Sequence, residues 1–481
     1  MDDQQGTAIR ATDASVIIDA ADYFKHARRV MHEASRRIML IGWDFDARVN
    51  LGADRSDEWG PPKVGDFIHS LVDRNSALEV FLLRWDIGAI KSLLRGSTLL
   101  TYLSWIRHPR IHIKLDGYHP TGASHHQKLI IVDDRIAFCG GIDVTGMRWD
   151  TRDHLDPDPR RRFPGNKPYP PWHDAAMVLS GPAAAGLGEV GRLRWNHATG
   201  IRLEPVTTDK PLQWPQELSK DFSDVRVNIL QTLPEMPDRA AVHEVETRYL
   251  ALIAQAEQYV YIESQYFSAR RIAEAIAKRL SSSRPPEFVI INPRTAEGWL
   301  EPIAMDTGRA RIWNALKKLD TAGRLRIYHP VTGQGSDIYV HAKIMIVDDV
   351  VLRIGSSNLN NRSMRLDTEC DVEVLADAGG SSMVSERIRQ IRDSLIAEHL
   401  GAAIEDVESS VQRTKSLIGT IDELRGTGKT LVDYEPPTLS DTEKFLADNQ
   451  ILDPEGPDEM FEALDRRGLF RNWHHWRRRR A

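Results

Sequence analysis

Two segments of this chain carry the same three chemically active residue types at the same spacing. Each has a histidine, a lysine two residues later and an aspartate five residues after the lysine. They are His126, Lys128 and Asp133 in the first copy and His341, Lys343 and Asp348 in the second. Because side chains alternate along a strand, a histidine and a lysine two positions apart lie on one face. Each copy therefore presents an imidazole and an ammonium group together.

Two such pairs around one pocket would suit chemistry at a phosphate. Two lysines neutralise the phosphoryl oxygens and the charge that develops on them in a transition state. Two histidines divide the roles of nucleophile and general acid, and no metal is needed. Surface side chains at the end of a core strand and a zinc site are the alternatives. The lysine near each histidine disfavours zinc, as does the lack of a cysteine or carboxylate cluster beside it in the sequence.

The elements around each copy must bring the two pairs together. An apolar run follows each lysine and predicts a strand buried on both faces. Turns rich in small residues come next, at 140–143 and 355–358. A self-match at this separation is too long for a solenoid repeat. We interpret it as a duplicated domain in which each copy supplies half of one site.

The spacing of apolar residues predicts helices and strands in similar order in both halves. In the first half we expect helices at 12–36, 64–72 and 99–106 and strands at 37–45, 78–85, 111–115 and 129–132. In the second half we expect helices at 242–258 and 309–319 and strands at 259–263, 288–292 and 325–328, followed by the second His-Lys strand. This order predicts α/β domains with a parallel or mixed sheet. The boundary is expected within 202–223, where prolines interrupt regular structure.

Each half also places a carboxylate at the start of a later apolar strand. Asp174 precedes a strand expected at 175–179, and Glu369 precedes one at 370–375. A catalytic histidine needs a partner that fixes its tautomer and stabilises its cation, so both are candidates. An ordinary carboxylate at a strand start is the alternative. A Pro- and Arg-rich loop at 156–171 is long enough to line the site, with a solvated surface loop as the alternative.

The composition indicates an ordinary globular chain of two or three domains. Its 481 residues carry a net charge of −6, which does not suggest a general nucleic-acid binder. Cys139 and Cys370 cannot form a disulfide framework, and a reducing compartment fits best. The sequence shows no secretory signal and no run of membrane-spanning length. We expect a cytoplasmic protein, at most peripheral on a membrane, with export by a signal-independent route left open.

The duplicated His-x-Lys-x4-Asp motif resembles the signature of the phospholipase D superfamily, and the resemblance covers about residues 30–400. Further blocks resemble eukaryotic-type phospholipases D, here in a compact bacterial form. The blocks are 140–143 with 148–151, 171–174 with 180–183, 194–196, 261–267, 354–358 with 361–364, and 367–369. The signature identifies only the superfamily, whereas the blocks favour true phospholipases D over nucleases and cardiolipin synthases.

The resemblance implies a fold of two duplicated α/β domains with mixed sheets flanked by helices. The domains are related by a pseudo-twofold axis, with the active site between them. We place the first domain at 1–210, the second at 211–425 and a tail at 426–481. No cofactor is implied, and neither is calcium dependence through an added membrane-targeting domain. As partners we expect a phospholipid membrane surface and no nucleic acid, and we expect a monomer.

The same resemblance implies roles for the site residues. His126 is expected to be the nucleophile that forms a phosphohistidine. His341 is expected to protonate the leaving alcohol and then to activate water or an acceptor alcohol. Each histidine is backed by a carboxylate from the other copy, Glu369 behind His126 and Asp174 behind His341. The remaining expected roles are phosphoryl binding by Lys128, Lys343 and Asn358, substrate contact by Asp143 and Ser356, and a structural role for Asp133 and Asp348.

We therefore expect a phosphodiesterase that converts glycerophospholipids to phosphatidic acid and a head-group alcohol, with transfer to a second alcohol. A cardiolipin-synthase-like phosphatidyltransferase and a nuclease on the same scaffold are the alternatives. A membrane-binding scaffold with a dead site is disfavoured because both motifs are intact. One histidine must be neutral and the other protonated, so a bell-shaped pH profile is predicted. A single limb across roughly pH 4–9 would contradict it.

The C-terminal tail falls outside the resemblance. Residues 433–462 are acidic and contain proline, with helical segments expected at 441–448 and 457–464. Residues 466–480 combine arginines with phenylalanine and tryptophan, a composition that suits an anionic membrane surface. A disordered solvated tail and an intramolecular clamp on the acidic segment are the alternatives. Equal sedimentation of full-length and tail-deleted protein with anionic vesicles would exclude membrane contact by the tail.

Overall fold

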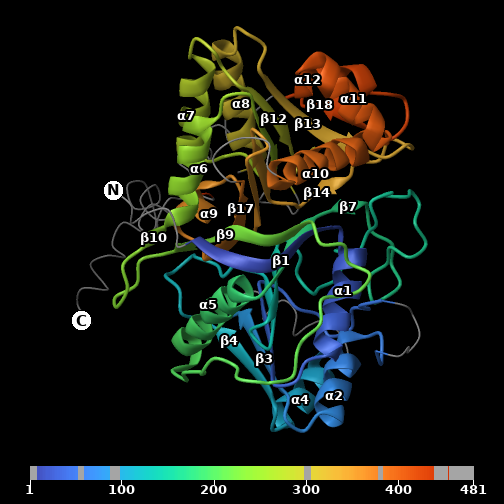
Figure 1. The fold of residues 1–481 in the computed structure, drawn as a ribbon, viewed down its shortest axis with the longest axis vertical. Coiled ribbons are helices and arrows are strands. Elements are labelled where there is room, and N and C mark those ends of the chain that lie inside the picture. The colour runs from blue at the N-terminus through green and yellow to red at the C-terminus, as the bar shows by residue number, and fades with distance from the viewer. Residues whose placement is uncertain are drawn as a thin grey trace, which may run out of the picture.

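The two halves of the chain share one continuous β-sheet. The computed structural model describes residues 8–52, 59–86, 98–296, 305–376, 383–437 and 453. Within these residues the halves lie one above the other along the long axis, and helices cover the sheet (Figure 1). The boundary expected at 210/211 therefore separates two halves of one body rather than two separate sheets.

The first half supplies one side of this sheet and the helices around it. Its strands are β1 (Ala8–Ile18), β2 (Arg37–Gly42), β3 (Glu79–Trp85), β4 (Ile111–Asp116), β5 (Leu129–Val132), β6 (Ile136–Gly140) and β8 (Ala175–Ser180). Its helices are α1 (Ala20–His32), α2 (Val64–Arg74), α4 (Thr98–Arg107) and α5 (Pro182–Thr199). The short strand β7 (Trp172–His173) lies outside the main sheet and pairs with the other half.

The second half supplies the other side. Its strands are β9 (Phe222–Leu233), β11 (Tyr259–Glu263), β12 (Glu287–Ile291), β13 (Leu325–Val331), β15 (Ile344–Val347), β16 (Val351–Gly355) and β17 (Glu369–Leu375), with β10 (Val242–His243) beside β9 and β14 (Tyr339–Val340) beside β7. Its helices are α6 (Glu244–Gln255), α7 (Arg270–Leu280), α8 (Thr307–Leu319), α9 (Asn361–Arg365) and α10 (Met383–Leu400). The helices α11 (Ile404–Thr414) and α12 (Leu417–Leu424) and the strand β18 (Thr430–Asp433) follow.

The order of the strands shows the duplication directly. From the centre outwards the first half runs β1-β8-β6-β5-β2-β3-β4, and the second runs β9-β17-β16-β15-β11-β12-β13. In each half the three outer strands are parallel and the others are antiparallel. The equivalent strands β1 and β9 pair antiparallel at the centre. A pseudo-twofold axis therefore passes between β1 and β9, and the expected duplicated α/β fold is confirmed.

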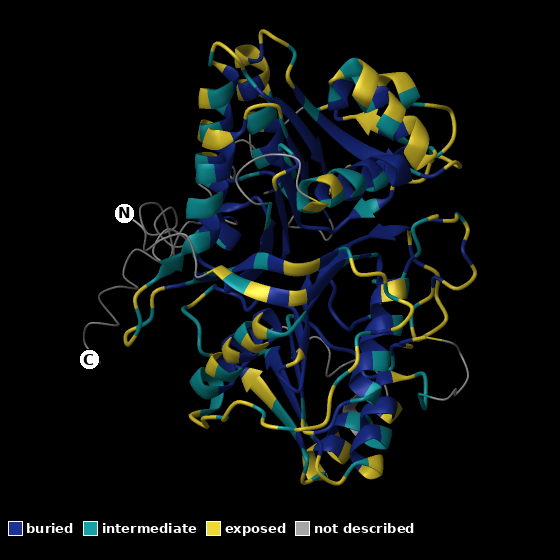
Figure 2. Ribbon diagram, in the orientation of Figure 1, coloured by how far each residue is buried: buried dark blue, intermediate teal, exposed yellow. Residues whose placement is uncertain are grey.

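The burial of side chains explains why these segments adopt these structures. Every residue of β5 and of β15 is buried, as expected of apolar runs inside a sheet. On α7 the buried residues Ile272, Ile276 and Leu280 recur every four positions, so one face packs on the sheet. Figure 2 shows the same division, with a buried sheet and exposed residues on the outer faces of the helices.

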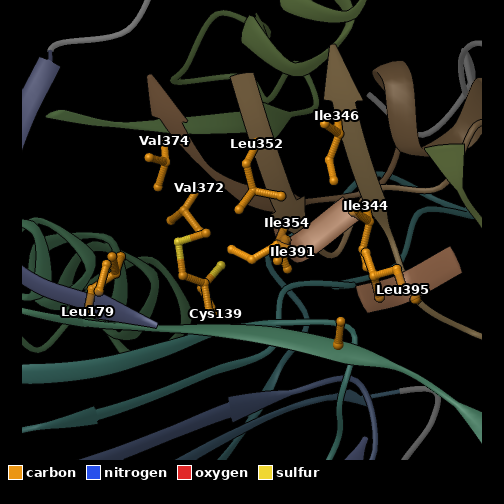
Figure 3. Close-up of a cluster of buried hydrophobic side chains, with 14 of the residues drawn as sticks. Cys139, Leu179, Ile344, Ile346, Leu352, Ile354, Val372, Val374, Ile391 and Leu395 are labelled. Carbon is orange, nitrogen blue, oxygen red and sulfur yellow. The ribbon is translucent and has the colours of Figure 1, made fainter. Parts of the chain in front are cut away.

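One apolar cluster spans both halves and holds them together. It contains Cys139 and Leu179 from the first half with Ile354, Val372 and Leu395 from the second (Figure 3). Both cysteines of the chain are free and buried. The two halves are therefore joined by hydrophobic packing as well as by the β1–β9 pairing.

The helix expected at 12–36 is wrong in its first part. Residues up to Ile18 form β1, which lies between β8 and β9, and α1 begins only at Ala20. Val16, Ile17 and Ile18 are β-branched and favour a strand. Asp19 then adopts φ 65°, which separates the strand from the helix. The pairing partners of β1 lie more than 150 residues away, so helical spacing alone could not reveal them.

The end of the second half was also placed too early. The strand β18 pairs antiparallel with β13, so the sheet extends beyond the expected boundary at 425/426. The helical segments expected at 441–448 and 457–464 and the Arg/Trp-rich residues 466–480 lie outside the described residues. None of the described helices is long and apolar enough to cross a membrane.

Candidate active site

The two His-Lys segments lie at the seam between the halves, and each runs beside a segment of the other half. The N–H of His126 donates to the carbonyl of Thr368 at 2.9 Å. The N–H of His341 donates to the carbonyl of His173 at 2.8 Å, where β14 pairs with β7. Each histidine is thus positioned by the segment that carries the other half's carboxylate.

Both histidines present the same ring nitrogen to a buried carboxylate. His126 Nδ1 lies 3.1 Å from each carboxylate oxygen of Glu369. His341 Nδ1 lies 2.7 Å from Asp174 Oδ2. These are the two pairings that the resemblance implied, one carboxylate crossing from each half. With Nδ1 held in this way, Nε2 is the nitrogen of each ring that is available for chemistry.

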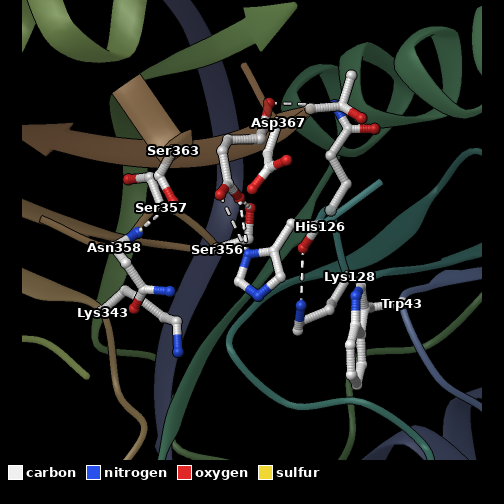
Figure 4. Close-up of polar contacts among 12 residues, drawn as sticks. Trp43, His126, Lys128, Lys343, Ser356, Ser357, Asn358, Ser363 and Asp367 are labelled. Carbon is white, nitrogen blue, oxygen red and sulfur yellow. Dashed lines mark hydrogen bonds and ion pairs between the residues drawn. The ribbon is translucent and has the colours of Figure 1, made fainter. Parts of the chain in front are cut away.

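The two lysines are buried and lean back toward their own histidines. Lys128 Nζ donates to His126 O at 2.7 Å, and Lys343 Nζ donates to His341 O. An ammonium group has three N–H donors, so each lysine keeps donors for a ligand. Figure 4 shows Lys128, Lys343 and Asn358 around the His126 ring. The structure therefore brings the expected phosphoryl-binding side chains into one place.

Burial and positive charge together disfavour charged histidines in this site. Burial lowers the pKa of both His126 and His341 well below the usual value, and the nearby lysines lower both further. Burial also lowers the pKa of Lys343 to about 7 and raises that of Asp174 to about 7. Burial raises the pKa of Glu369 well above its usual range. An anionic phosphate ester would relieve this repulsion and favour the protonated form of a histidine beside it.

Asn358 and Asp143 occupy equivalent positions in the two halves but are engaged differently. Asn358 is buried, and its Oδ1 has no hydrogen-bond partner among the described residues, so this amide can serve a ligand. Asp143 Oδ1 accepts the N–H of Trp43 at 3.0 Å, while its Oδ2 lies 3.5 Å from Lys128 Nζ. The strand expected at 37–45 ends at Gly42, and Asp143 instead holds the turn that follows it.

Ser356 supports a carboxylate rather than facing open space. Its hydroxyl donates to Glu369 Oε2 at 2.5 Å and accepts the N–H of Cys370 at 3.0 Å. Glu369 is the group behind His126, so Ser356 fixes the carboxylate that fixes the imidazole. Substrate contact by Ser356 stays a prediction, and its described bonds give it a positioning role.

The aspartates of the two motifs organise the start of a neighbouring strand. Asp133 accepts the N–H groups of residues 35–37 at 2.7–2.8 Å, just where β2 begins. Asp348 accepts those of residues 257–259 at 2.7–2.9 Å, where β11 begins. Both aspartates adopt a left-handed backbone, with φ 53° and 50°. These contacts are structural, in line with the role expected for both residues.

Sequence reasoning missed the aromatic and arginine groups of the site. The guanidinium of Arg148 lies 4.3 Å from the ring centre of Trp172, and that ring lies 5.1 Å from His341. Arg148 helps to lower the pKa of His341. Trp43 stands beside Lys128 in Figure 4. Arg148 and Trp172 lie within the family-like blocks, so their positions were visible in the sequence although their contacts were not.

The Pro- and Arg-rich loop at 156–171 is held mainly by its own contacts. Arg161 is buried and donates to Asp150 and to Tyr169 O, each at 3.1 Å. Arg160 pairs with Asp158 in the loop. Among the described residues these two arginines bond to no side chain of the two His-Lys pairs. They therefore stabilise the loop rather than line the site, and because Arg161 is buried the alternative of a solvated surface loop does not describe it either.

The fold and the site together define a duplicated α/β protein with paired histidines and lysines at its seam. Residues 249–391 match the family model described as "Cardiolipin synthase, PLD-like domain". The chain is 26% identical to phospholipase D A of Dictyostelium discoideum, over 80% of this chain and 35% of the relative. It is 23% identical to phospholipase D1 of Saccharomyces cerevisiae, over 82% of this chain and 29% of the relative. The chain belongs to the phospholipase D superfamily.

Two further comparisons bear on length and on fold. The chain is 23% identical to phospholipase D alpha 4 of Arabidopsis thaliana, over 82% of this chain and 66% of that relative. It spans only about a third of the length of the Dictyostelium and yeast relatives. Phosphatidylserine synthase of Haemophilus influenzae has a similar fold, with a TM-score of 0.56 at 15% identity over 87% of this chain and 97% of that one. At this identity the likeness to the solved structure concerns the fold alone.

Proposed function

We propose that the chain is a phospholipase D that cleaves the distal phosphodiester bond of glycerophospholipids at a membrane surface. The products are phosphatidic acid and the head-group alcohol, and a second alcohol can replace water. The carrying observation is the pair of Nδ1–carboxylate contacts, 3.1 Å at His126 and 2.7 Å at His341, which leaves the Nε2 atom of each ring for chemistry in a site that also holds two buried lysines. Similarity to phospholipases D over about four-fifths of the chain supports the lipid substrate.

The first step is the formation of a covalent intermediate. His126 Nε2 attacks the phosphorus, a P–N bond forms, and the bond from phosphorus to the head-group oxygen breaks. His341 Nε2 gives its proton to that leaving oxygen. Lys128, Lys343 and the amide of Asn358 bind the phosphoryl oxygens and stabilise the charge that they carry in the transition state. The negative charge of the bound ester raises the pKa of His341, which supplies the protonated acid that the ligand-free site disfavours.

The second step reverses these roles. Neutral His341 takes a proton from water, the water oxygen attacks the phosphorus, and the P–N bond to His126 breaks. The proton count of the site is then restored, and phosphatidic acid leaves. An alcohol in place of water gives a new phosphodiester by the same movements. Glu369 and Asp174 keep both rings in the required tautomer throughout and stabilise their cationic forms.

A phosphatidyltransferase is the second candidate, because two comparisons favour transfer. The matched family model is described as a cardiolipin synthase domain, and the similar structure is a phosphatidylserine synthase. Both candidates share the covalent intermediate and differ only in the acceptor. A nuclease on the same scaffold has no such support here.

The test is a reaction with phosphatidylcholine and phosphatidylethanolamine vesicles containing a little ethanol, followed by separation of the lipid products. Wild type is expected to form phosphatidic acid and phosphatidylethanol. His126→Ala is expected to lose both by roughly 10³-fold or more. His69→Ala is a matched control, because this partly exposed histidine on α2 is outside the site.

The outcomes separate the candidates. Phosphatidylethanol without phosphatidic acid would assign the chain to transferases. No lipid turnover, with cleavage of a nucleic acid or a simple aryl phosphodiester that depends on His126, would keep the two-histidine chemistry and overturn the lipid substrate. Equal activity of wild type and His126→Ala would overturn the mechanism.

A further inference from the structure

A second cluster of titratable side chains lies behind Asp174, outside the two-histidine site. It consists of Asp19, which links β1 to α1, His154, His173 in β7 and Glu398 in α10. All four are buried, and their possible ligand atoms lie within 4.8 Å of one another. Three come from the first half and one from the second. Such a concentration of donor atoms in the interior needs a stabilising partner.

Four distances within the cluster lie near the edge length of a metal-centred tetrahedron. His173 Nδ1 lies 2.9 Å from Glu398 Oε1 and 3.4 Å from Asp19 Oδ1. His154 Nε2 lies 3.3 Å from Glu398 Oε1 and 3.6 Å from Asp19 Oδ2. A tetrahedral ion with metal–ligand distances of about 2.0–2.1 Å places its ligands about 3.3–3.4 Å apart. The cluster has two nitrogens and two carboxylates at this spacing.

Two of these donor atoms are unsatisfied. Among the described residues, neither Asp19 Oδ2 nor His173 Nδ1 has a hydrogen-bond partner, although both are buried. Buried polar atoms are rarely left without a partner. Two buried atoms left without a hydrogen-bond partner in so crowded a cluster point to a ligand that they share.

The ring nitrogens of His154 and His173 that point away from the cluster have the contacts typical of metal-bound histidines. His154 Nδ1 lies 3.1 Å from Asp150 Oδ2, and His173 Nε2 lies 2.7 Å from Glu263 Oε2. A histidine that binds a metal through one nitrogen usually donates from the other to a carboxylate. Both histidines therefore turn one nitrogen to a carboxylate and the other into the cluster.

The neighbouring group of His173, Glu263 and His399 is different. His399 Nε2 lies 3.0 Å from Glu263 Oε1, so the carboxylate is fully engaged by ordinary hydrogen bonds to both rings. This group supports the cluster and does not form a second one.

The charges around the cluster also suit a bound cation. Four buried carboxylates surround the histidines, and two of them have an arginine: Glu398 pairs with Arg152 and Asp150 with Arg161. Among the described residues, the ion pairs of Asp19 and Glu263 are with histidines alone. Either two added protons or one dication would balance the remaining charge.

We propose that Asp19, His154, His173 and Glu398 bind one divalent transition-metal ion, with zinc the ion that best suits two imidazoles and two carboxylates. The ion links α10 of the second half to the first half. It also lies behind the active site, because Asp19 Oδ1 accepts the N–H of Asp174 at 3.0 Å. The expectation that no metal is needed concerned the two-histidine chemistry and does not involve this cluster.

The test begins with the metal content of the full chain, produced with zinc in the medium and purified without chelator. Mass spectrometry of the acid-digested protein is expected to find about one zinc ion per chain. A strong chelator is expected to remove the ion and lower the thermal midpoint, and added zinc is expected to restore it. Cobalt(II) in place of zinc is expected to give the intense visible bands of a tetrahedral site.

Two variants and one control locate the site. Glu398→Gln and His154→Gln are expected to lose the ion, each from a different half of the chain. His26→Gln removes another buried histidine, on α1, and is expected to keep it. Both ligand variants can be followed by the cobalt spectrum, and a folded variant without visible bands supports the site.

Clear results would overturn the proposal. Wild type with no bound metal, both as purified and after incubation with zinc, would mean that protons on the two histidines balance the charge. A full equivalent of zinc in both folded variants would place any bound ion elsewhere. A thermal midpoint unmoved by chelator and by zinc would exclude a metal cross-link between the halves.

Discussion

Asp174 and His341 come from opposite halves of the chain, yet Asp174 Oδ2 lies 2.7 Å from His341 Nδ1. The parallel pairing of β7 with β14 brings them together. The same relationship holds between Glu369 and His126 in the other direction. Neither His126 nor His341 has this carboxylate in its own half. The site therefore exists only while the two halves are docked.

Replacing the carboxylate of Asp174 should impair catalysis more than folding. In Asp174→Asn the amide can donate to Nδ1, which favours the tautomer with the proton on Nε2 and removes the stabilisation of the cation. We expect kcat to fall on the order of 10³-fold with a smaller change in KM. Asp153→Asn, at an exposed position, is the control. Steady-state kinetics with a fluorescent phospholipid, and a thermal melt of each variant, would check this. Equal kcat in the two variants would contradict it.

The division of labour between the two histidines predicts an asymmetric response to the leaving group. Nitrophenolate leaves without a general acid, so His341→Ala should still release about one nitrophenolate per chain from phosphatidyl-p-nitrophenol in a burst. The reaction of this variant should then stop, because no residue activates water to cleave the phosphohistidine. His126→Ala should give no burst with this substrate, and neither variant should cleave phosphatidylcholine. Rapid-mixing absorbance is the measurement. A burst in His126→Ala that is absent in His341→Ala would exchange the two roles.

The motif aspartates predict a loss of stability without a loss of chemistry. Asp133 accepts the N–H groups of residues 35–37, and an asparagine at this position would lack the charge that strengthens these bonds. Asparagine tolerates the left-handed φ, so Asp133→Asn isolates the hydrogen bonds. We expect a loss of about 2–4 kcal/mol in the free energy of unfolding. Urea denaturation beside Asp73→Asn, an exposed carboxylate, would measure it. Lost activity in a variant of unchanged stability would instead place Asp133 in the chemistry.

Local sequence predicted those strands that are short apolar runs. β5 and β11 have the bounds expected, since each is a short run of mostly buried residues in which β-branched or aromatic types predominate, and such a run suits a strand. The strands β6, β9 and β16 and the helices α5, α7 and α10–α12 were not predicted. Two further strands, β1 and β18, were also missed. Each is placed by distant partners, β1 by β8 and β9 and β18 by β13, and neither partner can be inferred from local spacing.

The residues of the site likewise fall into those that the sequence predicted and those that it did not. His126 and His341 were predicted because the same motif occurs twice in the sequence with identical internal spacing. Their carboxylates were predicted from the family resemblance. Spacing could not show that Asp143 holds Trp43 or that Arg148 lies on an aromatic ring, because these contacts join residues through space. The metal cluster was missed for this reason too, since its four members are spread over most of the chain.

The last prediction concerns Lys343, whose pKa burial lowers to about 7. Below that pH the side chain is an ammonium ion in the ligand-free site, and above it the charge is lost. A bound phosphodiester favours the ammonium form, so binding above pH 7 must take up a proton. Affinity for a diester anion is therefore expected to fall as the pH rises, by roughly tenfold between pH 7 and pH 8.5.

Calorimetric titration with glycerophosphocholine would measure this, because the charge of that diester does not change over the range. Repeating the titration in buffers of different ionisation enthalpy would count the protons taken up. Lys343→Met should bind more weakly at every pH and should lose most of the dependence, while any contribution of other groups stays in the variant. A wild-type affinity that stays flat to pH 9, with no proton uptake, would show that Lys343 keeps its charge despite its burial.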